Sequence, residues 1–447
     1  MAPIGWGKQV WGGLVVAAGV LALGCGSEGG RDDADADGGQ GVLSLGGDGT
    51  DGGSMEGGGL TEGADGGGTG IKLDVAPADT EGMPGDGCAG DGGGGGGGGG
   101  MGGEGDLELS YIWISNTAQQ TISKIDTVTM VEEGRYAAKA AGGDPSRTSV
   151  NLQGDAAVAN RNGGVAKFWA DTEDCPDLNG NGIIETSTGG GDVLPFGTDE
   201  CMAWYLDLVC GSNRPLAWTR GEWNEAECAY TGANLWTVCD SNTLLLDGET
   251  GAILQTIPVP NSASPFVYGG AADGESNFWG LDLGSGQLYR VDHEDYSTQS
   301  WPLGPGGGYG ITVASDGNVF TCGGGGVSRF NVDTFTWDVA GSSGIGGCMT
   351  DGDSLIWHSD PTGMLLGYDI NTLTVVEQVQ LPEYVHGVSI DFQGHVWGVS
   401  FAANNAYRAD PITDVVDTFP NLVGAYTYSD MTGFALSSAG TIDPPQG

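Results

Sequence analysis

Basic residues are scarce in this chain of 447 residues. It contains 14 Lys and Arg against 59 Asp and Glu, which gives a formal net charge of −45. Phosphate backbones and anionic lipid headgroups repel a chain with this net charge. We therefore expect no nucleic-acid partner. Divalent cations, basic surfaces and neutral glycans remain open as partners.

Other absences narrow the chemistry. The nine cysteines include no Cys-x-x-Cys pair, which argues against a structural zinc site. The chain has no Gly-x-Ser-x-Gly or His-Glu-x-x-His phrase, the signatures of two large groups of hydrolases. It has only four histidines, and its last three-quarters shows no long apolar pattern of helical period. These absences favour β structure and leave few catalytic candidates.

The N-terminus reads as an export signal. Lys8 precedes an apolar run from Trp11 to Leu23, which is shorter than the about 20 residues that a bilayer span needs. Small residues stand directly before Cys25, as in a bacterial lipobox, although Ala22 replaces the usual Leu. We therefore expect a lipoprotein signal peptide over residues 1–24 and an acylated Cys25 that anchors the chain in the bacterial envelope, in the outer membrane. The alternative is an ordinary signal peptide with an incidental cysteine.

A low-complexity segment follows over residues 25–106. It consists mostly of Gly, Asp, Glu, Ser and Ala, with an unbroken glycine run from Gly92 to Gly100. Such a segment lacks the apolar area that offsets chain entropy, so it is predicted to be disordered. A flexible chain of this length reaches roughly 50 Å, which is enough to hold a folded domain off a membrane.

A repeated phrase fills residues 107–440. Each copy has a strand, a turn and an aromatic strand, as in Ile311–Phe320, followed by an apolar hairpin with an acidic turn, as in Gly326–Asp333. Copies follow one another at roughly 40 residues, the spacing of propeller blades. The pattern therefore predicts that each copy of the repeat forms four short antiparallel strands. The anchors that set the register are Trp113, Ala157, Trp236, Trp279, Phe320, Trp357 and Trp397.

The two ends of the array are complementary. The first copy begins at its second strand, over residues 108–115, whereas the segment 428–433 matches an inner strand and its turn. We expect the C-terminal strand to complete the first blade, because closure removes an open sheet edge. The predicted fold is an all-β, seven-bladed β-propeller with N- and C-terminal strand closure, and we expect a monomer.

The phrases Tyr309-Gly310-Ile311-Thr312-Val313-Ala314 and His386-Gly387-Val388-Ser389-Ile390-Asp391 resemble the virginiamycin B lyase-like family. Its members are seven-bladed propellers related to NHL and YVTN repeats, and the resemblance covers roughly residues 107–436. It implies the propeller fold. For enzymes of the family it also implies a small His/Glu group on the inner strands that works with magnesium and opens a cyclic depsipeptide by elimination.

Two histidines are the catalytic candidates for that alternative. His386 opens an inner strand and His358 follows an anchor, so we expect both to face the central channel. A histidine there can serve as a general base near neutral pH. No Glu-x-His pair exists, however, and the family's aromatic-x-Thr-Glu phrase is replaced by Trp236-Thr237-Val238-Cys239 and Trp397-Gly398-Val399-Ser400. A lone histidine at a strand start is also commonly structural.

An insertion at about residues 170–225 nearly doubles the spacing between the second and third anchors. Oxygen donors at Asp177, Asn179 and Asn181 alternate along the chain before Gly182, as in an EF-hand-type loop. This spacing predicts a structural calcium ion, and the alternative is a cluster of Asn-Gly turns without metal.

Further ligands are needed to complete that calcium site. Ile183 offers a backbone carbonyl, and Glu185 is placed to bind directly or through water. Thr188 stands where such loops carry a bidentate Glu. Candidates to replace that ligand are Asp192, Asp199 and Glu200.

The cysteines suit an exported chain, in which disulfides are permitted. Cys175 and Cys201 flank the insertion, and Cys322 and Cys348 lie in adjacent copies, so each is a natural pair. Three further cysteines can form only one disulfide, and which two of them pair stays open. They are Cys210, Cys228 and Cys239.

The leading functional hypothesis is an envelope-anchored lipoprotein whose propeller binds an unidentified glycan, peptide or protein without catalysis. The first alternative is a lyase or hydrolase that acts at the central channel face with magnesium. The second is a purely structural spacer.

Overall fold

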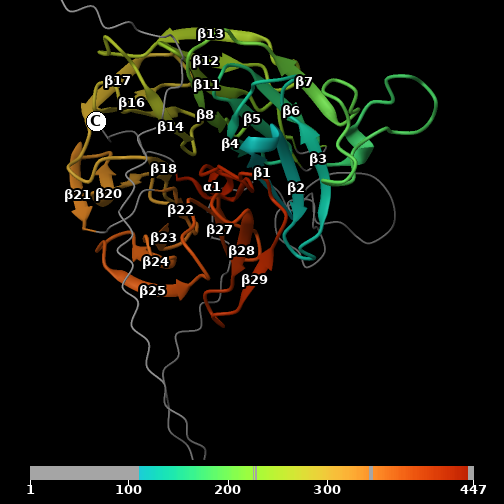
Figure 1. Ribbon diagram of the computed structural model, residues 1–447. Helices are drawn as coiled ribbons and strands as arrows, with labels where there is room; N and C mark the ends of the chain where they lie inside the picture. The colour runs from blue at the N-terminus through green and yellow to red at the C-terminus, as the bar shows by residue number, and fades with distance from the viewer. Residues whose placement is uncertain (1–109, 225, 227–228, 342–345, 441–447) are drawn as a thin grey trace, which may run out of the picture. The chain divides into compact units, whose positions relative to one another are not determined.

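The computed structural model describes residues 110–224, 226, 229–341 and 346–440, which form a ring of radial β-sheets (Figure 1). The first blade contains β1 (Tyr111–Asn116), β2 (Thr121–Asp126) and β3 (Glu132–Ala137). The second contains β4 (Pro145–Val150), β5 (Ala156–Asn160), β6 (Val165–Phe168) and β7 (Met202–Leu206). The third contains β8 (Asn213–Trp218), β11 (Leu235–Cys239), β12 (Asn242–Leu246) and β13 (Ile253–Pro258).

Four regular blades complete the ring. The fourth contains β14 (Val267–Ala272), β15 (Phe278–Asp282), β16 (Gln287–Val291) and β17 (Thr298–Pro302). The fifth contains β18 (Gly310–Val313), β19 (Val319–Gly323), β20 (Gly326–Asn331) and β21 (Thr336–Ala340). The sixth contains β22 (Cys348–Thr350), β23 (Leu355–Ser359), β24 (Met364–Asp369) and β25 (Val375–Gln380). The seventh contains β26 (Gly387–Ile390), β27 (Val396–Ser400), β28 (Asn405–Ala409) and β29 (Val416–Phe419).

The repeat register predicted from the sequence is confirmed. Every anchor lies on the second strand of its blade, and all are buried. Two of the anchor indoles make the same hydrogen bond. Trp279 Nε1 donates to Asp273 Oδ2 at 2.9 Å, and Trp397 Nε1 donates to Asp391 Oδ2 at 2.8 Å. Each aspartate directly follows the inner strand of the same blade. A buried indole N–H thus finds an acceptor while its ring packs between blades.

The ring closes through the C-terminal segment, as predicted. Tyr426 N donates to Ser115 O at 3.1 Å, and Asn116 forms an antiparallel bridge with Ala425. The side chain of Asn116 also accepts from Val423 N at 2.8 Å. The segment after Val423 is therefore the inner strand of the first blade, and the sheet edge of β1 is covered.

The two ends of the ring axis differ. Connections from second to third strands, and from each blade to the next, lie at one end, which we call the mouth face. Connections from first to second and from third to fourth strands lie at the other end, which we call the plug face. The short helix α1 (Phe434–Ser438) belongs to the plug face, where Gly274 N donates to Gly440 O at 2.9 Å and Arg220 donates to Ser437 O at 2.8 Å.

The region 170–225 adds two separate excursions on the plug face. A loop over residues 169–201, with the 3₁₀ turn η2 (Thr172–Asp174), separates β6 from β7. The hairpin β9 (Glu222–Asn224) with β10 (Ala229–Thr231) separates β8 from β11. The same region also contributes β7 and β8 to the blades, and a further 3₁₀ turn, η1 (Thr117–Gln119), follows β1.

Three disulfides are present in the described part of the chain. Both predicted pairs form, Cys175 with Cys201 and Cys322 with Cys348, and the latter joins the fifth blade to the sixth. Cys210 pairs with Cys239. The signal peptide with Cys25, the tether with Cys88, and Cys228 lie outside the described residues. Among residues 110–440, apart from the short gaps, no helix is long and apolar enough to cross a bilayer.

Candidate ligand site on the propeller axis

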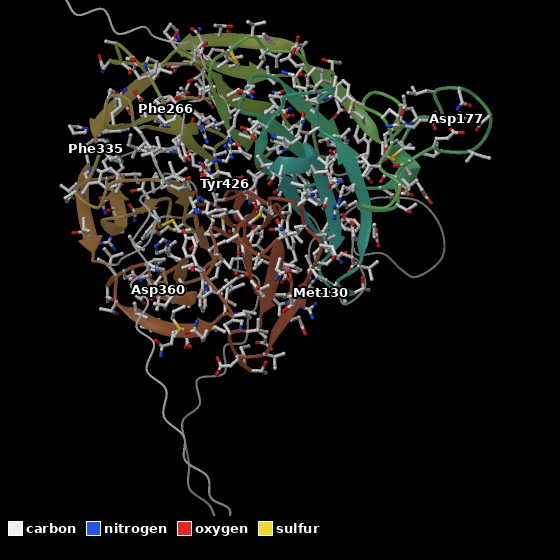
Figure 2. All side chains as sticks on the ribbon, viewed as in Figure 1. Met130, Asp177, Phe266, Phe335, Asp360 and Tyr426 are labelled. Carbon is white, nitrogen blue, oxygen red and sulfur yellow. A yellow bond between two sulfur atoms is a disulfide. The ribbon has the colours of Figure 1, made fainter. Side chains whose placement is uncertain are left out.

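The inner strands bring a group of aromatic and basic side chains to the mouth face. We call this group the axial cluster: Arg147 on β4, Arg214 on β8, Tyr268 on β14, Tyr309 before β18, His386 before β26, and Tyr426 and Tyr428 on the closing segment. Figure 2 shows Tyr426 near the centre of the ring. Members come from six of the seven blades, so only the closed ring assembles them.

The phenol groups form a continuous network. Tyr268 Oη lies 2.5 Å from Tyr309 Oη and 3.0 Å from Tyr426 Oη. Tyr309 and Tyr426 are also hydrogen-bonded through their hydroxyls. His386 Nε2 lies 3.0 Å from Tyr309 Oη, and its Nδ1 lies 3.0 Å from Tyr384 Oη. Three hydroxyl oxygens and one imidazole nitrogen therefore meet at one place.

Guanidinium groups lie on the faces of these rings. The Arg147 guanidinium carbon is 3.2 Å from the ring centroid of Tyr428, and Arg214 lies 4.6 Å from that of Tyr268. Arg147 is 2% exposed and donates to the carbonyls of Tyr428 and Tyr268 at 2.8 and 2.7 Å. No carboxylate among the described residues pairs with Arg147. A buried cation without an anion is costly, so the cluster favours negative charge.

The arginines change the acidity of one phenol. Burial opposes ionisation of Tyr268, but the charges of Arg214 and Arg147, together with hydrogen bonds to Tyr309 and Tyr426, outweigh it and lower the pKa of this phenol. Burial and the neighbours Tyr428 and Tyr426 raise the pKa of Tyr309 well above its usual range. Burial also raises the pKa of Tyr426, to about 12. Tyr268 is therefore the phenol of this network that ionises most readily.

A small cavity lies among the inner strands of the ring. A cavity of about 30 Å³ remains between successive inner strands, with Ser149, Leu216, Thr312 and Met349 among its lining residues. Such a volume holds one or two water molecules. Asp430 also lines it, and its carboxylate accepts the amides of Gly433 and Leu436 at the start of α1, at 2.9 and 3.0 Å.

The two predicted histidines have different surroundings. His386 belongs to the axial cluster. His358 lies on β23 and is fully buried, with Nδ1 3.2 Å from Gly347 O, and its Nε2 has no hydrogen-bond partner in the described structure. Burial lowers the pKa of His358. The structure brings His386 together with tyrosines and does not bring the two histidines together.

The predicted calcium ligands gather in the loop that projects from the second blade, where Figure 2 marks Asp177. Asp177 accepts the amide of Gly180 at 2.6 Å through Oδ1 and that of Gly182 at 2.7 Å through Oδ2. Asn179 and Asn181 donate their side-chain amides to the two oxygens of Glu185, at 2.8 and 2.6 Å. The backbone amides that Asp177 accepts, first that of Gly182 and then that of Gly180, lower the pKa of its carboxyl group.

This donor set suits a hard cation. It is built from Asp, Asn and Glu oxygens, and rotation of the two amides turns their oxygens toward Glu185. Gly180 and Gly182 have φ of 72° and 83°, which the tight turns require. Ile183 N donates to Asn181 Oδ1 at 2.7 Å, so the Ile183 backbone lies in the same loop.

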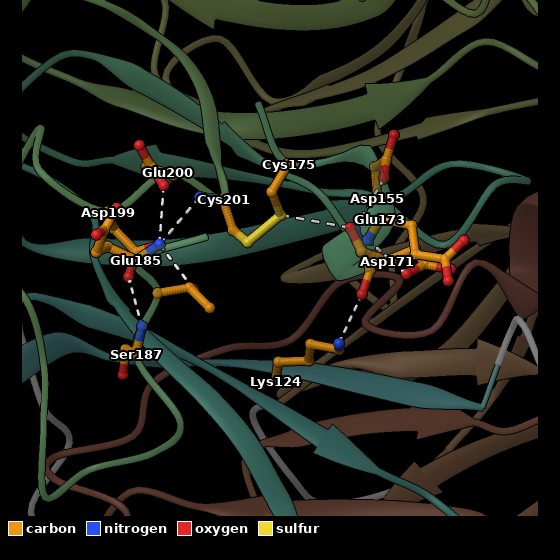
Figure 3. The surroundings of a disulfide bond; sticks show 12 residues. Lys124, Asp155, Asp171, Glu173, Cys175, Glu185, Ser187, Asp199, Glu200 and Cys201 are labelled. Atoms are coloured by element: carbon orange, nitrogen blue, oxygen red, sulfur yellow. Dashed lines mark hydrogen bonds between the residues drawn. A yellow bond between two sulfur atoms is a disulfide. The ribbon is translucent and has the colours of Figure 1, made fainter. Parts of the chain in front are cut away.

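The candidates for the missing bidentate ligand support the base of this loop. Glu200 accepts the amides of Leu178 and Glu185, both at 2.8 Å, beside the disulfide shown in Figure 3. Asp199 accepts from Ser187 N at 3.0 Å, and Asp192 accepts from Thr188 N at 3.0 Å. All three carboxylates are thus occupied by backbone amides. No group of three His, Cys, Asp or Glu side chains in the described ranges is arranged around a metal position.

The tyrosines and arginines of the axial cluster were missed by sequence reasoning. One signal was available: the dipeptides Tyr268-Gly269, Tyr309-Gly310 and His386-Gly387 occupy the same place at the start of three inner strands. An aromatic or imidazole side chain followed by glycine at this position indicates a residue near the propeller axis. The arginines of the axial cluster are not part of such a sequence motif.

Comparison with known proteins supports the fold. No family model matches the chain, and no curated relative does either. A protein from Lactobacillus plantarum is 12% identical with a TM-score of 0.50, over 71% of this chain and 97% of that one. A virginiamycin B lyase from Staphylococcus aureus is 12% identical with a TM-score of 0.45, over 66% of this chain and 91% of that one.

A streptogramin B lyase is also similar. It is 19% identical with a TM-score of 0.36, over 42% of this chain and 65% of that one, so the match spans less than two thirds of that lyase. The domain described here is a seven-bladed β-propeller. The resemblance stated from the sequence is confirmed at the level of the fold.

Proposed function

We propose that this protein is an envelope-anchored lipoprotein whose propeller captures a small anionic ligand at the axial cluster, without changing it chemically. The observation that carries the proposal is the buried guanidinium of Arg147, which no described carboxylate neutralises. It lies on the axis of a protein whose net charge is −45. Acidic side chains are abundant, yet none of the described ones pairs with this cation.

The rim of the axial cluster offers apolar contact as well. Phe266 and Phe401 are 38% and 40% exposed, and their rings lie against Tyr268 and His386 respectively. Arg161 lies 4.4 Å from the Tyr426 ring and 3.4 Å from Asp144. A ligand with an anionic group and a flat apolar part would match both features.

Calorimetry with the purified full-length protein tests this proposal. We expect benzoate to bind and benzamide, its neutral analogue, not to bind. Arg161→Gln should weaken benzoate binding, because it removes a rim charge without touching the buried inner strands. Equal binding of benzoate and benzamide would contradict an anion site. So would the absence of binding by all of benzoate, citrate and phosphate.

The anchoring part of the proposal has its own test. Cys25→Ser should move the protein from the membrane fraction to the soluble fraction, because an acyl chain needs the thiol. Unchanged partition would mean that another segment holds the chain at the membrane.

Elimination chemistry is the second candidate. It is favoured by one observation, the 3.0 Å approach of His386 Nε2 to Tyr309 Oη, since such a pair can move a proton. Incubation with quinupristin and magnesium, followed by chromatography, tests it. We expect the ring to stay intact; ring opening that is lost in His386→Ala would replace the binding proposal.

A further inference from the structure

A lysine and an aspartate are buried against each other in the second blade. Lys167 lies on β6, and Asp155 directly precedes β5. Their side chains are 1% and 2% exposed, and Lys167 Nζ lies 3.1 Å from Asp155 Oδ2. Among the described residues this ammonium makes no hydrogen bond of regular geometry, although an ammonium can donate several. The pair therefore bears much of the desolvation cost of two buried charges.

The second blade differs from its equivalents at these two positions. Asp155 accepts the amide of Ala170 at 3.0 Å, and in the fourth blade Asn277 accepts the equivalent amide, that of His293, at 2.9 Å. The residue that pairs with the anchor on the third strand is Lys167 in the second blade and an arginine in the fourth and fifth blades. Arginine and asparagine thus stand where the second blade has lysine and aspartate. These equivalents are Arg290 with Asn277, and Arg329 with Asn318.

The surroundings of the lysine exclude water. Ala157, which pairs with Lys167 across the strands, is the one anchor of the repeat without a ring, so the lysine side chain has room to lie inside the blade. The Lys167 ammonium lies 3.9 Å from the ring centroid of Trp169 and 5.7 Å from that of Trp218. An amine and a carboxyl group are therefore held together between two indoles, away from solvent.

Such a site favours condensation of the two groups. In water, hydration stabilises the charged pair, whereas in a buried site the charges are costly and a neutral amide is not. Burial raises the pKa of Asp155 despite the neighbouring ammonium, so its carboxyl group holds a proton more readily than usual. Glu249 Oε1 lies 3.9 Å from Lys167 Nζ, and this side chain is 60% exposed. It offers a path for protons between the pair and solvent.

We propose that Lys167 and Asp155 form an intramolecular isopeptide bond. The ammonium first transfers a proton to the carboxylate, which gives a neutral amine and a carboxylic acid. The lone pair of Nζ then forms a bond to Cγ of Asp155, and one C–O bond of the acid breaks. The oxygen leaves as water with its own hydrogen and one from the amine. An ammonium and a carboxylate thus become an amide and one water molecule, with no electron transferred and no co-reactant consumed.

The bond has a local structural consequence. It joins the start of β5 to β6 and so closes this hairpin covalently, just before the loop that the Cys175–Cys201 disulfide closes. The blade whose anchor has no ring then has two covalent ties. The inference goes beyond the anion site and does not depend on it.

Tryptic peptide mapping of the reduced full-length protein tests the proposal. Arg161 lies between Asp155 and Lys167, so trypsin separates the two in an unlinked chain. We expect a branched peptide that contains both residues, lighter by one water molecule than its two parts, and no cleavage after Lys167. Lys167→Arg should give only the separate linear peptides. The matched control Lys124→Arg should keep the branched peptide, because the ion pair of Lys124 is with Glu133.

A further variant tests the path of the protons. Glu249→Gln should lower the linked fraction in freshly prepared protein and leave the fold intact, because this side chain is mostly exposed. Wild-type protein that trypsin cleaves after Lys167, with only linear peptides on either side, would overturn the bond and leave an ordinary buried ion pair. The wild-type map decides the matter even if a variant fails to fold, and calorimetry with benzoate reports on the anion site separately.

Discussion

The backbone amide of Trp113 donates a hydrogen bond of 2.9 Å to the carbonyl of Met431, so the first and last segments of the propeller share one blade. The same segment supplies Tyr426 and Tyr428 to the axial cluster. Ring closure and site assembly are therefore one structural event.

Deleting residues 424–447 should abolish cooperative unfolding. The deletion uncovers the edge of β1 and removes the inner strand of the first blade, together with α1. Thermal unfolding followed by circular dichroism measures the effect. The control is deletion of residues 441–447, which follow the last described contact of the plug face. A shorter chain that ends at Val423 and melts like the full-length protein would contradict closure.

His358 should make the fold sensitive to acid. Burial lowers its pKa below the usual 6.5. As pH falls below about 6.5, the unfolded chain takes up the proton before the folded one does, so stability decreases. His358→Gln should show a smaller loss of unfolding free energy between neutral pH and about pH 5.5 in urea titrations. An identical pH dependence in wild type and variant would show that His358 does not contribute.

Tyr268 should ionise before the other tyrosines of the axial cluster. Its pKa is lowered although burial opposes this, because the charges of Arg214 and Arg147 favour the phenolate. Ultraviolet titration should show one phenolate forming below the usual range, and Tyr268→Phe should remove that step. Since the folded pKa lies below the unfolded one, this group stabilises the fold increasingly as pH rises toward about 10. If the ionisation below the usual range disappeared in Tyr289→Phe and not in Tyr268→Phe, it would belong to Tyr289 and the prediction would be wrong.

Calcium should bind the projecting loop. Calorimetry should show heat of binding, and calcium should raise the melting temperature; Asp177→Ala should lose both. Asp369→Ala is the matched control, because Asp369 also accepts backbone amides in a turn, those of Asn371 and Thr372, but its described contacts include no Asn or Glu side chain. Absence of heat and of any thermal shift in the wild-type protein would leave the loop as a cluster of turns.

The fold was predictable because burial repeats along the chain. Trp279 and Trp397 occupy equivalent positions in their blades, and each has its aspartate six residues earlier. Packing between blades imposes this pattern locally, so a single sequence carries it. The Cys322–Cys348 pair was predictable for the same reason, since equivalent depths in adjacent repeats lie close together.

The axial cluster was not predictable in the same way. The inner strands of six blades contribute one or two residues each, and what makes these residues a group is the ring. Tyrosine is common in this chain, which has 13, and a tyrosine before a glycine carries no chemical signature alone. Histidine is rare, so His386 attracted attention while its partners Tyr309 and Tyr268 did not.

The closing strand also has a consequence for biosynthesis. A ribosome makes the chain from its N-terminus, so the segment that pairs with β1 emerges after all seven sets of outer strands. Blades in the middle of the array can pack on their neighbours earlier, but the first blade keeps an unpaired edge until that segment has been made. The ring is therefore expected to close only after its last strand has emerged, with the joining of its two ends as the slowest step.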